Sequence, residues 1–378
     1  MNMRKKHVNE IFLLRSIACL SIVLLHSITW GTEHIRHLSK LPDWLLIVLD
    51  SLNVWLYYGT PAFIFITAFI LGYSYKGREI QIKPFFMKRI QFILIPYLCM
   101  AVLYALPYVL ISFEQFLIKV FLNSIIGDFH AYFVLIIFQF YVFFVLFKKW
   151  FDKHSSTFVI FGSLLINIIY LSIFNFTSPP NIWFSEYIWE RYYWIPFPGW
   201  IFYFAVAYYF GSHYETLSRS LRRYKYGILV SSILTSSLLL YLYHSGLLTI
   251  HSSKRVDILF HTLTIVLLIF YFATKLKSIP IAFMLISKYS YGIYLLHTFY
   301  MAILILFLTL ISINLGVLTI FILFLGSIFA SISTIYFFNL FSFGKFIVGK
   351  VDINSDPIFQ PNSNATVQSH QNVPIREK

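Results

Sequence analysis

The stretch that decides the fold is IFLLRSIACLSIVLLHSITW, residues 11–30, which is apolar enough to cross a bilayer as one helix. It nevertheless contains Arg15 and His26. Eleven positions of an α-helix advance three turns and about 20°, so the two side chains project from one face, about 16 Å apart along the axis. An arginine within a span costs roughly 2.5 to 3.5 kcal/mol on insertion scales and normally faces a bundle interior or a wet cavity. We therefore expect this face to line a functional site.

Each of the two residues also has a structural explanation. Arg15 lies about one turn into the apolar run, so its side chain could reach the lipid headgroups instead. A single histidine in a span is often a neutral residue that bonds to a neighbouring helix, and His26 could be one. The occurrence of both residues on one face favours a functional role.

The composition is that of an integral membrane protein. Of the 378 residues, 59% are hydrophobic and only 12% are charged, which excludes an ordinary soluble domain. The formal net charge of +14 could suit a nucleic-acid-binding protein. The basic residues lie at the ends of apolar segments, however, so no nucleic-acid partner is expected. Cys19 and Cys99 both fall within predicted spans and indicate neither a disulfide framework nor a zinc site.

Ten apolar segments predict an all-α, polytopic fold. After the first, the windows are 53–72, 92–111, 131–147, 157–174, a shorter one at about 198–211, 226–243, 256–273, 291–311 and 315–338. Segments 44–49 and 279–286 are too short to span and are expected to be interfacial. We expect residues 1–350 to form one transmembrane domain and the polar residues 351–378 to form a disordered cytoplasmic tail.

Lysine and arginine residues are distributed unevenly between alternate loops. In the ten-span arrangement, 22 of the 29 lie on the side of the two termini and six lie on the other side, with Arg15 inside the first span. Cytoplasmic loops carry the excess of these residues in membrane proteins. The distribution predicts that both termini are cytoplasmic, with Arg15 near the inner leaflet and His26 toward the outer one.

Several motifs carry a resemblance to a known family. The first span has the pattern Arg-x10-His, and the ninth contains SYGIYLLH at 290–297. Together with the ten spans, these motifs resemble the membrane-bound acyltransferase-3 family, whose members acylate sugars of surface polysaccharides, lipopolysaccharide and antibiotics. The stretches GTPAFIFITAFILG (59–72), ILIPY (93–97), YFVLIIFQF (132–140) and GWIFYF (199–204) are similar to its intercellular-adhesion branch. That branch occurs in biofilm loci and is associated with poly-N-acetylglucosamine.

The resemblance covers about residues 10–350 and implies an enzyme of the bacterial cell membrane. Its donor would be cytoplasmic acyl-coenzyme A, its acyl group acetyl or succinyl, and its acceptor a surface polysaccharide or a lipid-linked precursor. No permanently bound cofactor is expected, because acyl-coenzyme A is a substrate. The bilayer and the glycan are the expected partners, and a glycan synthase is a further candidate.

The expected donor site departs from the family pattern. Many relatives carry two arginines three residues apart before the third span, whereas here Lys88 and Arg89 precede the apolar residues and only one basic position fits. We expect Arg89 and Lys88 to contact the donor from the cytoplasmic side. Arg15 could bind an anionic or carbonyl part of the pantetheine arm.

O-acylation of a sugar requires a base for the attacking hydroxyl, and an imidazole suits this task. His26 is our candidate. His297, flanked by Tyr291 and Tyr294, could orient the base or contact the acceptor, and the two tyrosines are candidate substrate contacts. Such a set in a span is as often a contact between helices.

For the other polar groups, a structural role is at least as well supported as a functional one. Asp128 with His130 and Asp257 with His261 lie close in sequence at the outer ends of predicted spans. An interfacial structural role is favoured for both pairs, with His130 kept as a candidate acceptor contact. The outward loop 175–198 mixes aromatic and acidic residues, which suits either a glycan-binding mouth or an aromatic belt. No metal site is expected, because the histidines are spread over different helices without ligand spacing.

Two alternatives without catalysis remain open. The chain could export poly-beta-1,6-N-acetylglucosamine, with Arg15 and His26 lining a conduit, or it could be a structural partner of a glycosyltransferase.

Overall fold

The computed structural model describes residues 8–311 and 314–352, and this part of the chain contains helices and no strand. Eight helical segments are long and apolar enough to span a membrane: Asn9–His34, Asp43–Tyr75, Ile82–Leu110, Phe113–Lys153, Ser156–Phe176, Lys225–His244, Ile281–Ile311 and Leu318–Asn339. Two shorter apolar helices, Ile201–Ser212 and Ile258–Ala273, lie where the sixth and eighth spans were predicted. The prediction of an all-α, polytopic membrane protein is therefore confirmed. The predicted tail lies outside the described residues from 353 onward.

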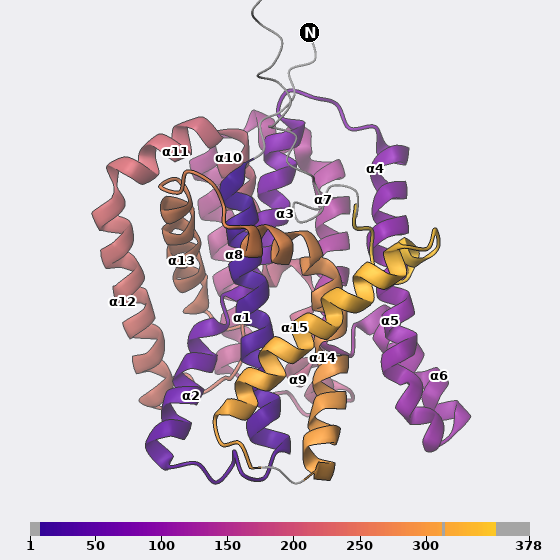
Figure 1. Cartoon of the computed structure of the whole chain (residues 1–378). Helices are drawn as coiled ribbons and strands as arrows, with labels where there is room; N and C mark the ends of the chain where they lie inside the picture. The colour runs from indigo at the N-terminus through magenta and orange to yellow at the C-terminus, as the bar shows by residue number, and fades with distance from the viewer. Residues whose placement is uncertain (1–7, 312–313, 353–378) are drawn as a thin grey trace, which may run out of the picture.

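Helix α1 (Asn9–His34) runs through the middle of the bundle (Figure 1). It contacts α2 (Asp43–Leu56), α3 (Gly59–Tyr75), α13 (Ile258–Ala273), α14 (Ile281–Ile311) and α15 (Leu318–Asn339). The other helices are α4 (Ile82–Arg89), α5 (Ile95–Ala105), α6 (Phe113–Phe121), α7 (Phe133–Lys153), α8 (Ser156–Phe176), α9 (Ser185–Glu190), α10 (Ile201–Ser212), α11 (Tyr214–Arg223) and α12 (Lys225–His244). We call the end at which α1 begins, beside α4 and α11, the N-terminal end, and the opposite end, beside α2 and α9, the far end (Figure 1).

The short helix α10 is buried on nearly every side, and it packs closely against α3. A Cβ atom on Gly72 would lie 2.1 Å from the Tyr208 carbonyl oxygen, and one on Gly211 would lie 2.1 Å from the Phe69 carbonyl oxygen. Only glycine allows the two backbones to approach this closely, a common device between membrane helices. The pair holds α3 in place, and α3 forms one wall of the site described below.

The connection between α4 and α5 departs from α-helical geometry. Residues Ile90–Leu94 form a π-helical turn, in which the Ile95 N–H bonds to the Ile90 carbonyl. Pro96 follows at the start of α5 and has no N–H to donate to the preceding turn. In addition, the Ile93 carbonyl accepts a hydrogen bond from the Tyr291 hydroxyl at 2.6 Å. This bond joins the turn to Tyr291 of α14, which lines a cavity described below, and π-turns are frequent at functional sites.

Two predicted interfacial segments are parts of longer helices. Residues 279–286 lead into α14, which begins at Ile281 and continues without a break to Ile311. The apolar window missed this start because Ser287, Lys288 and Ser290 interrupt it, and these side chains line a cavity of the bundle. Residues 44–49 belong to α2, which leads directly into α3 and exposes Trp44 and Ile47.

Candidate functional site

Two adjacent cavities lie along α1. The first, the Arg15 cavity, has a volume of about 360 Å³, and the second, the His26 cavity, has a volume of about 460 Å³. Ile22, Thr60 and Tyr294 line both cavities, so α1, α3 and α14 together form the wall between them. Since Arg15 is nearer the start of α1, the Arg15 cavity occupies the half toward the N-terminal end and the His26 cavity the half toward the far end.

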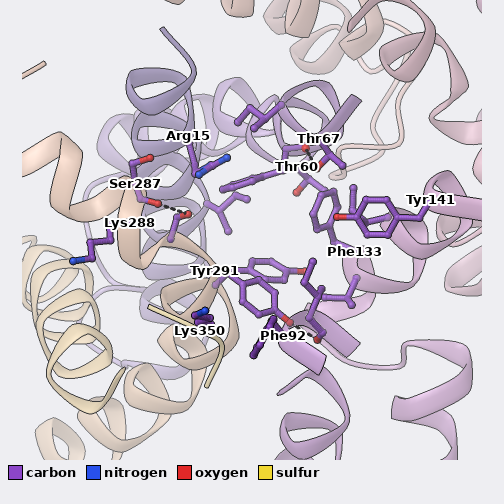
Figure 2. A pocket seen from close by; sticks show the side chains of 18 residues that line it. Arg15, Thr60, Thr67, Phe92, Phe133, Tyr141, Ser287, Lys288, Tyr291 and Lys350 are labelled. Carbon is purple, nitrogen blue, oxygen red and sulfur yellow. Dashed lines mark hydrogen bonds between the residues drawn. The ribbon is translucent and has the colours of Figure 1, made fainter. Parts of the chain in front are cut away.

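The guanidinium of Arg15 points into its cavity (Figure 2). Most of the wall is apolar or aromatic, and Tyr141, Tyr291 and Phe92 face the guanidinium from the other elements. Within residues 8–311 and 314–352, Arg15 forms no ion pair and no hydrogen bond to a protein group. Its cavity also contains the hydroxyl of Ser287, which is buried without a hydrogen-bond partner. A cation in such surroundings without a carboxylate is chemically suited to an anionic or carbonyl group.

His26 and His297 form a hydrogen-bonded pair. The Nδ1 atom of His26 lies 2.8 Å from the Nε2 atom of His297, and the two rings stack with centroids 5.0 Å apart. The Nδ1 atom of His297 lies 2.9 Å from the carbonyl oxygen of Ile293, one turn earlier on α14. A carbonyl only accepts, so this Nδ1 carries the proton, and the Nε2 of a neutral His297 must accept from the Nδ1–H of His26.

The consequence for His26 is a fixed tautomer. Its Nδ1 holds the ring proton, so in the neutral imidazole Nε2 keeps its lone pair. His26 lines its cavity, and its side chain is only partly covered by the protein. An imidazole at a cavity wall, with this tautomer held by a second residue, has the form that a general base requires.

His130 packs behind this pair. Its ring meets the His297 ring edge-on at 5.3 Å, its Nε2 donates to the Tyr294 carbonyl at 3.0 Å, and the Tyr294 hydroxyl donates to the His130 carbonyl at 2.7 Å. Thr298 lies 3.0 Å from the other ring nitrogen of His130. These reciprocal bonds connect the start of α7 to α14 and hold His297 in place.

The carboxylates predicted beside histidines have other partners. Asp128 pairs with Lys119 at 2.7 Å and with Arg191 at 3.1 Å. Asp257 pairs with Arg255 at 2.6 Å. In both cases a guanidinium or ammonium close in space forms the charge pair, and the histidine two or four residues away bonds to backbone and hydroxyl groups instead. The carboxylate–imidazole pairs therefore do not form.

Arg89 and Lys88 lie outside both cavities. They line a separate pocket at the N-terminal end, together with residues of the loop between α3 and α4. The Arg89 guanidinium donates to the Phe85 carbonyl at 2.7 Å and lies over the rings of Phe85 and Tyr141, at 3.5 and 4.5 Å from their centroids. Tyr141 also lines the Arg15 cavity, so one ring separates Arg89 from that cavity. The basic side chains that line the Arg15 cavity itself are Lys288 and Lys350.

Several residues of the His26 cavity have no counterpart in the sequence-based prediction. They include His251 and Lys254 from the loop between α12 and α13, whereas Arg191 and Trp194 belong to the loop 175–198, which was predicted as a glycan-binding mouth or an aromatic belt. One signal could have revealed Lys254: with Arg255 it forms a basic pair on the side that has only six such residues. An exception to the usual charge distribution requires a local explanation.

The described residues contain no group of three His, Cys, Asp or Glu side chains that could hold a metal ion. His26, His297 and His130 are close together, but every ring nitrogen of the three except the Nε2 of His26 takes part in the hydrogen bonds above.

Comparisons with known proteins show which sequences this chain resembles. Residues 8–336 match the acyltransferase-3 family model, described as an acyltransferase domain. A Bacillus subtilis protein named as a membrane-bound acyltransferase, YfiQ, is 33% identical over 354 residues, which cover 91% of this chain and 95% of the relative. Staphylococcus aureus and Staphylococcus epidermidis proteins named as poly-beta-1,6-N-acetyl-D-glucosamine export proteins are each 26% identical and cover 78% of this chain and 82% and 81% of the relatives. No solved structure matches the chain.

Proposed function

Because this chain belongs to the acyltransferase-3 family of multi-pass membrane proteins, we propose that it transfers an acyl group from acyl-coenzyme A to a hydroxyl of a cell-surface glycan or its precursor. The observation that carries the proposal is the His26–His297 pair, which leaves the His26 Nε2 available as a base in a cavity that adjoins the Arg15 cavity. One cavity would then receive the donor and the other the acceptor.

The charge distribution supports a cytoplasmic N-terminal end. In that orientation the Arg15 cavity lies on the side of the coenzyme A pool. The donor would enter from this end, with the basic residues at the cavity rim attracting its phosphates and Arg15 contacting the pantetheine arm or the thioester carbonyl. The acyl group would reach the wall formed by Thr60 and Tyr294, where the His26 cavity begins.

The reaction follows from this placement. The His26 Nε2 takes the proton of the acceptor hydroxyl as the oxygen attacks the thioester carbonyl carbon. A carbon–oxygen bond forms, the carbon–sulfur bond breaks, and the thiolate of coenzyme A takes the proton back from His26. His297 keeps the Nδ1–H of His26 bonded throughout and stabilises the imidazolium form. No metal or redox group is needed for this balance.

Purified protein with radiolabelled acetyl- or succinyl-coenzyme A and an oligosaccharide acceptor tests the proposal. We expect wild type to transfer label, and we expect His26→Ala and His26→Gln to lose transfer by roughly 10² to 10⁴. A His34→Gln variant is the matched control, because this exposed histidine of the same helix bonds only to the Trp30 carbonyl within the described chain. Transfer by His26→Gln at the wild-type rate would refute the assignment of the base.

Export of a glycan is the second candidate. Two cavities that share wall residues along one helix, together with relatives named as export proteins, favour it. A conduit residue matters mainly through size and polarity, so an exporter with His26→Gln should still place normal amounts of polymer outside the cell. Normal export by this variant, combined with no label transfer by wild type to any acceptor, would establish export instead.

A further inference from the structure

Lys254 is a buried cation of the His26 cavity without a carboxylate partner. It is only 6% exposed, and its side chain lines the cavity. Its Nζ lies 3.5 Å from the centroid of the Trp194 ring and 4.7 Å from that of Tyr132. In the part of the chain that the structure describes, no carboxylate approaches this ammonium within ion-pair distance. Buried ammonium groups are normally paired, so the missing partner requires an explanation.

The backbone around Lys254 is held firmly. The Asn175 side chain accepts from the Val256 N–H and donates to the Lys254 carbonyl, both at 3.0 Å. The fully buried Arg255 bonds to both oxygens of Asp257, at 3.0 and 2.6 Å. These contacts join the loop to α8 and α13. Lys254 is therefore a fixed feature of the cavity wall, unlike a mobile surface lysine.

The charge of the cavity is positive. Arg191 lies over the same two rings as Lys254, 4.5 Å from Trp194 and 5.8 Å from Tyr132. The one carboxylate of this cavity wall among the described residues, Asp128, already pairs with both Arg191 and Lys119. Burial and the Arg191 guanidinium hold the pKa of Lys254 well below its ordinary value. An anion bound beside Lys254 would offset both the burial of the ammonium group and its repulsion by Arg191.

We propose that Lys254, on the Trp194 and Tyr132 rings, binds an anionic group of the acceptor, a phosphate or a carboxylate carried by the sugar. The ammonium supplies the opposite charge, and the two rings against which it packs hold it at the cavity wall. The inference rests on the proposed function and narrows its acceptor to an acidic glycan or a sugar phosphate. A free amino sugar, which is cationic, would be repelled by the same cavity.

The location of Lys254 assigns the anion to the acceptor. It lies in the loop that joins α12 and α13 at the far end, whereas the donor is proposed to enter at the N-terminal end (Figure 1). The phosphates of coenzyme A would remain at the opposite side of the His26–His297 pair. Lys254 is thus a specificity residue for the second substrate.

Equilibrium binding to the purified full-length protein tests the proposal without requiring catalysis. The probes are N-acetylglucosamine 1-phosphate and glucuronic acid as anions, N-acetylglucosamine as the neutral sugar, and glucosamine as the cation. We expect wild type to bind at least one anionic probe about tenfold or more tightly than the neutral sugar, and Lys254→Met to lose this preference while Lys254→Arg retains it. Lys40→Met is the control, because this lysine is exposed and outside the cavity.

Transfer assays show whether the negative charge that Lys254 binds belongs to the acceptor sugar or to the acyl group. Wild type and Lys254→Met are compared with acetyl- and succinyl-coenzyme A on a neutral acceptor and on a sugar phosphate. Loss confined to the sugar phosphate supports the proposal, and loss confined to succinyl transfer would assign the anion to the acyl group and overturn it. Equal binding of anionic and neutral sugars by wild type would also overturn it, whether or not Lys254→Met folds. If wild type transfers nothing, the proposed function fails, and the binding preference alone decides the role of Lys254.

Discussion

Replacing His297 tests whether this residue only orients the His26 base or exchanges a proton itself. In His297→Leu the Nδ1–H of His26 loses its acceptor, whereas in His297→Gln the amide oxygen can lie near the position of the lost Nε2 and accept the same bond. The two variants therefore differ in one property, the presence of an acceptor for His26. We expect His297→Gln to transfer acyl groups at close to the wild-type rate and His297→Leu to be slower.

The expected loss of transfer rate in His297→Leu follows from the strength of the His26–His297 hydrogen bond. A neutral hydrogen bond contributes about 0.5–1.5 kcal/mol net, which corresponds to a factor of about 2 to 13 in the population of the competent His26 tautomer. The buried donor left without a partner adds a cost of about 1–3 kcal/mol to folding. Removal of the base itself costs roughly 10² to 10⁴ in rate. His297→Leu should therefore be slower than wild type by about one order of magnitude and faster than His26→Gln.

The assay is the initial rate of label transfer at saturating donor and equal amounts of folded protein, with thermal unfolding measured on the same samples. Two results would contradict the reasoning. A His297→Leu variant with the full wild-type rate would mean that the hydrogen bond does not select the tautomer. A His297→Leu variant as inactive as His26→Gln, and not rescued by His297→Gln, would mean that His297 itself exchanges a proton with the substrate.

Three further predictions concern other parts of the molecule. Gly211→Ala should lower the unfolding temperature measurably, because its Cβ would meet the Phe69 carbonyl oxygen at 2.1 Å and overpacking costs about 1–3 kcal/mol, whereas Gly227→Ala, which meets nothing within 4 Å, should not. Cysteines introduced at Ser39 and Gly77 should differ in labelling by an impermeant reagent in intact cells, with only the former reacting, and labelling of the latter would reverse the proposed orientation. Once the pH is above the second pKa of the phosphate, about 6, affinity for the sugar phosphate should fall as the pH rises further, because the lowered pKa of Lys254 leaves less ammonium while the phosphate keeps its charge. An affinity that rises with pH in that range would contradict this.

The fold was largely predictable because a bilayer imposes a length and a composition on each span. The apolar windows predicted the helices wrongly where the side chains face other parts of the protein, because such residues need not be apolar. The start of α14 carries Ser287 and Lys288, whose side chains face a cavity, so the local hydropathy there does not describe a lipid-facing helix. The π-turn at Ile90–Leu94 depends on a hydroxyl from α14, Tyr291, which no local pattern reveals.

The site was predictable only where one helix carries it. The spacing of Arg15 and His26 places them on one face whatever surrounds α1, and the cost of the arginine indicates a cavity. The contact of His26 with His297 joins residues 271 positions apart and was suggested only by the family resemblance. Lys254 and Arg191 come from two loops that meet over Trp194, and this convergence depends on the packing of α8, α10 and α13, which sequence spacing does not encode.

The two cavities share one electrostatic feature, which bears on the choice between transferase and exporter. Arg15 on one side of the His26–His297 pair and Lys254 on the other are both cations without a carboxylate partner in the described chain. Keeping an unpaired charge inside a membrane protein is costly, and a conduit for a neutral polymer has no use for two of them. Two substrates that each bring a negative charge to one cavity would compensate both cations only when bound together. Occupancy of both cavities would then favour the complex in which the thioester and the acceptor hydroxyl meet at the His26 Nε2.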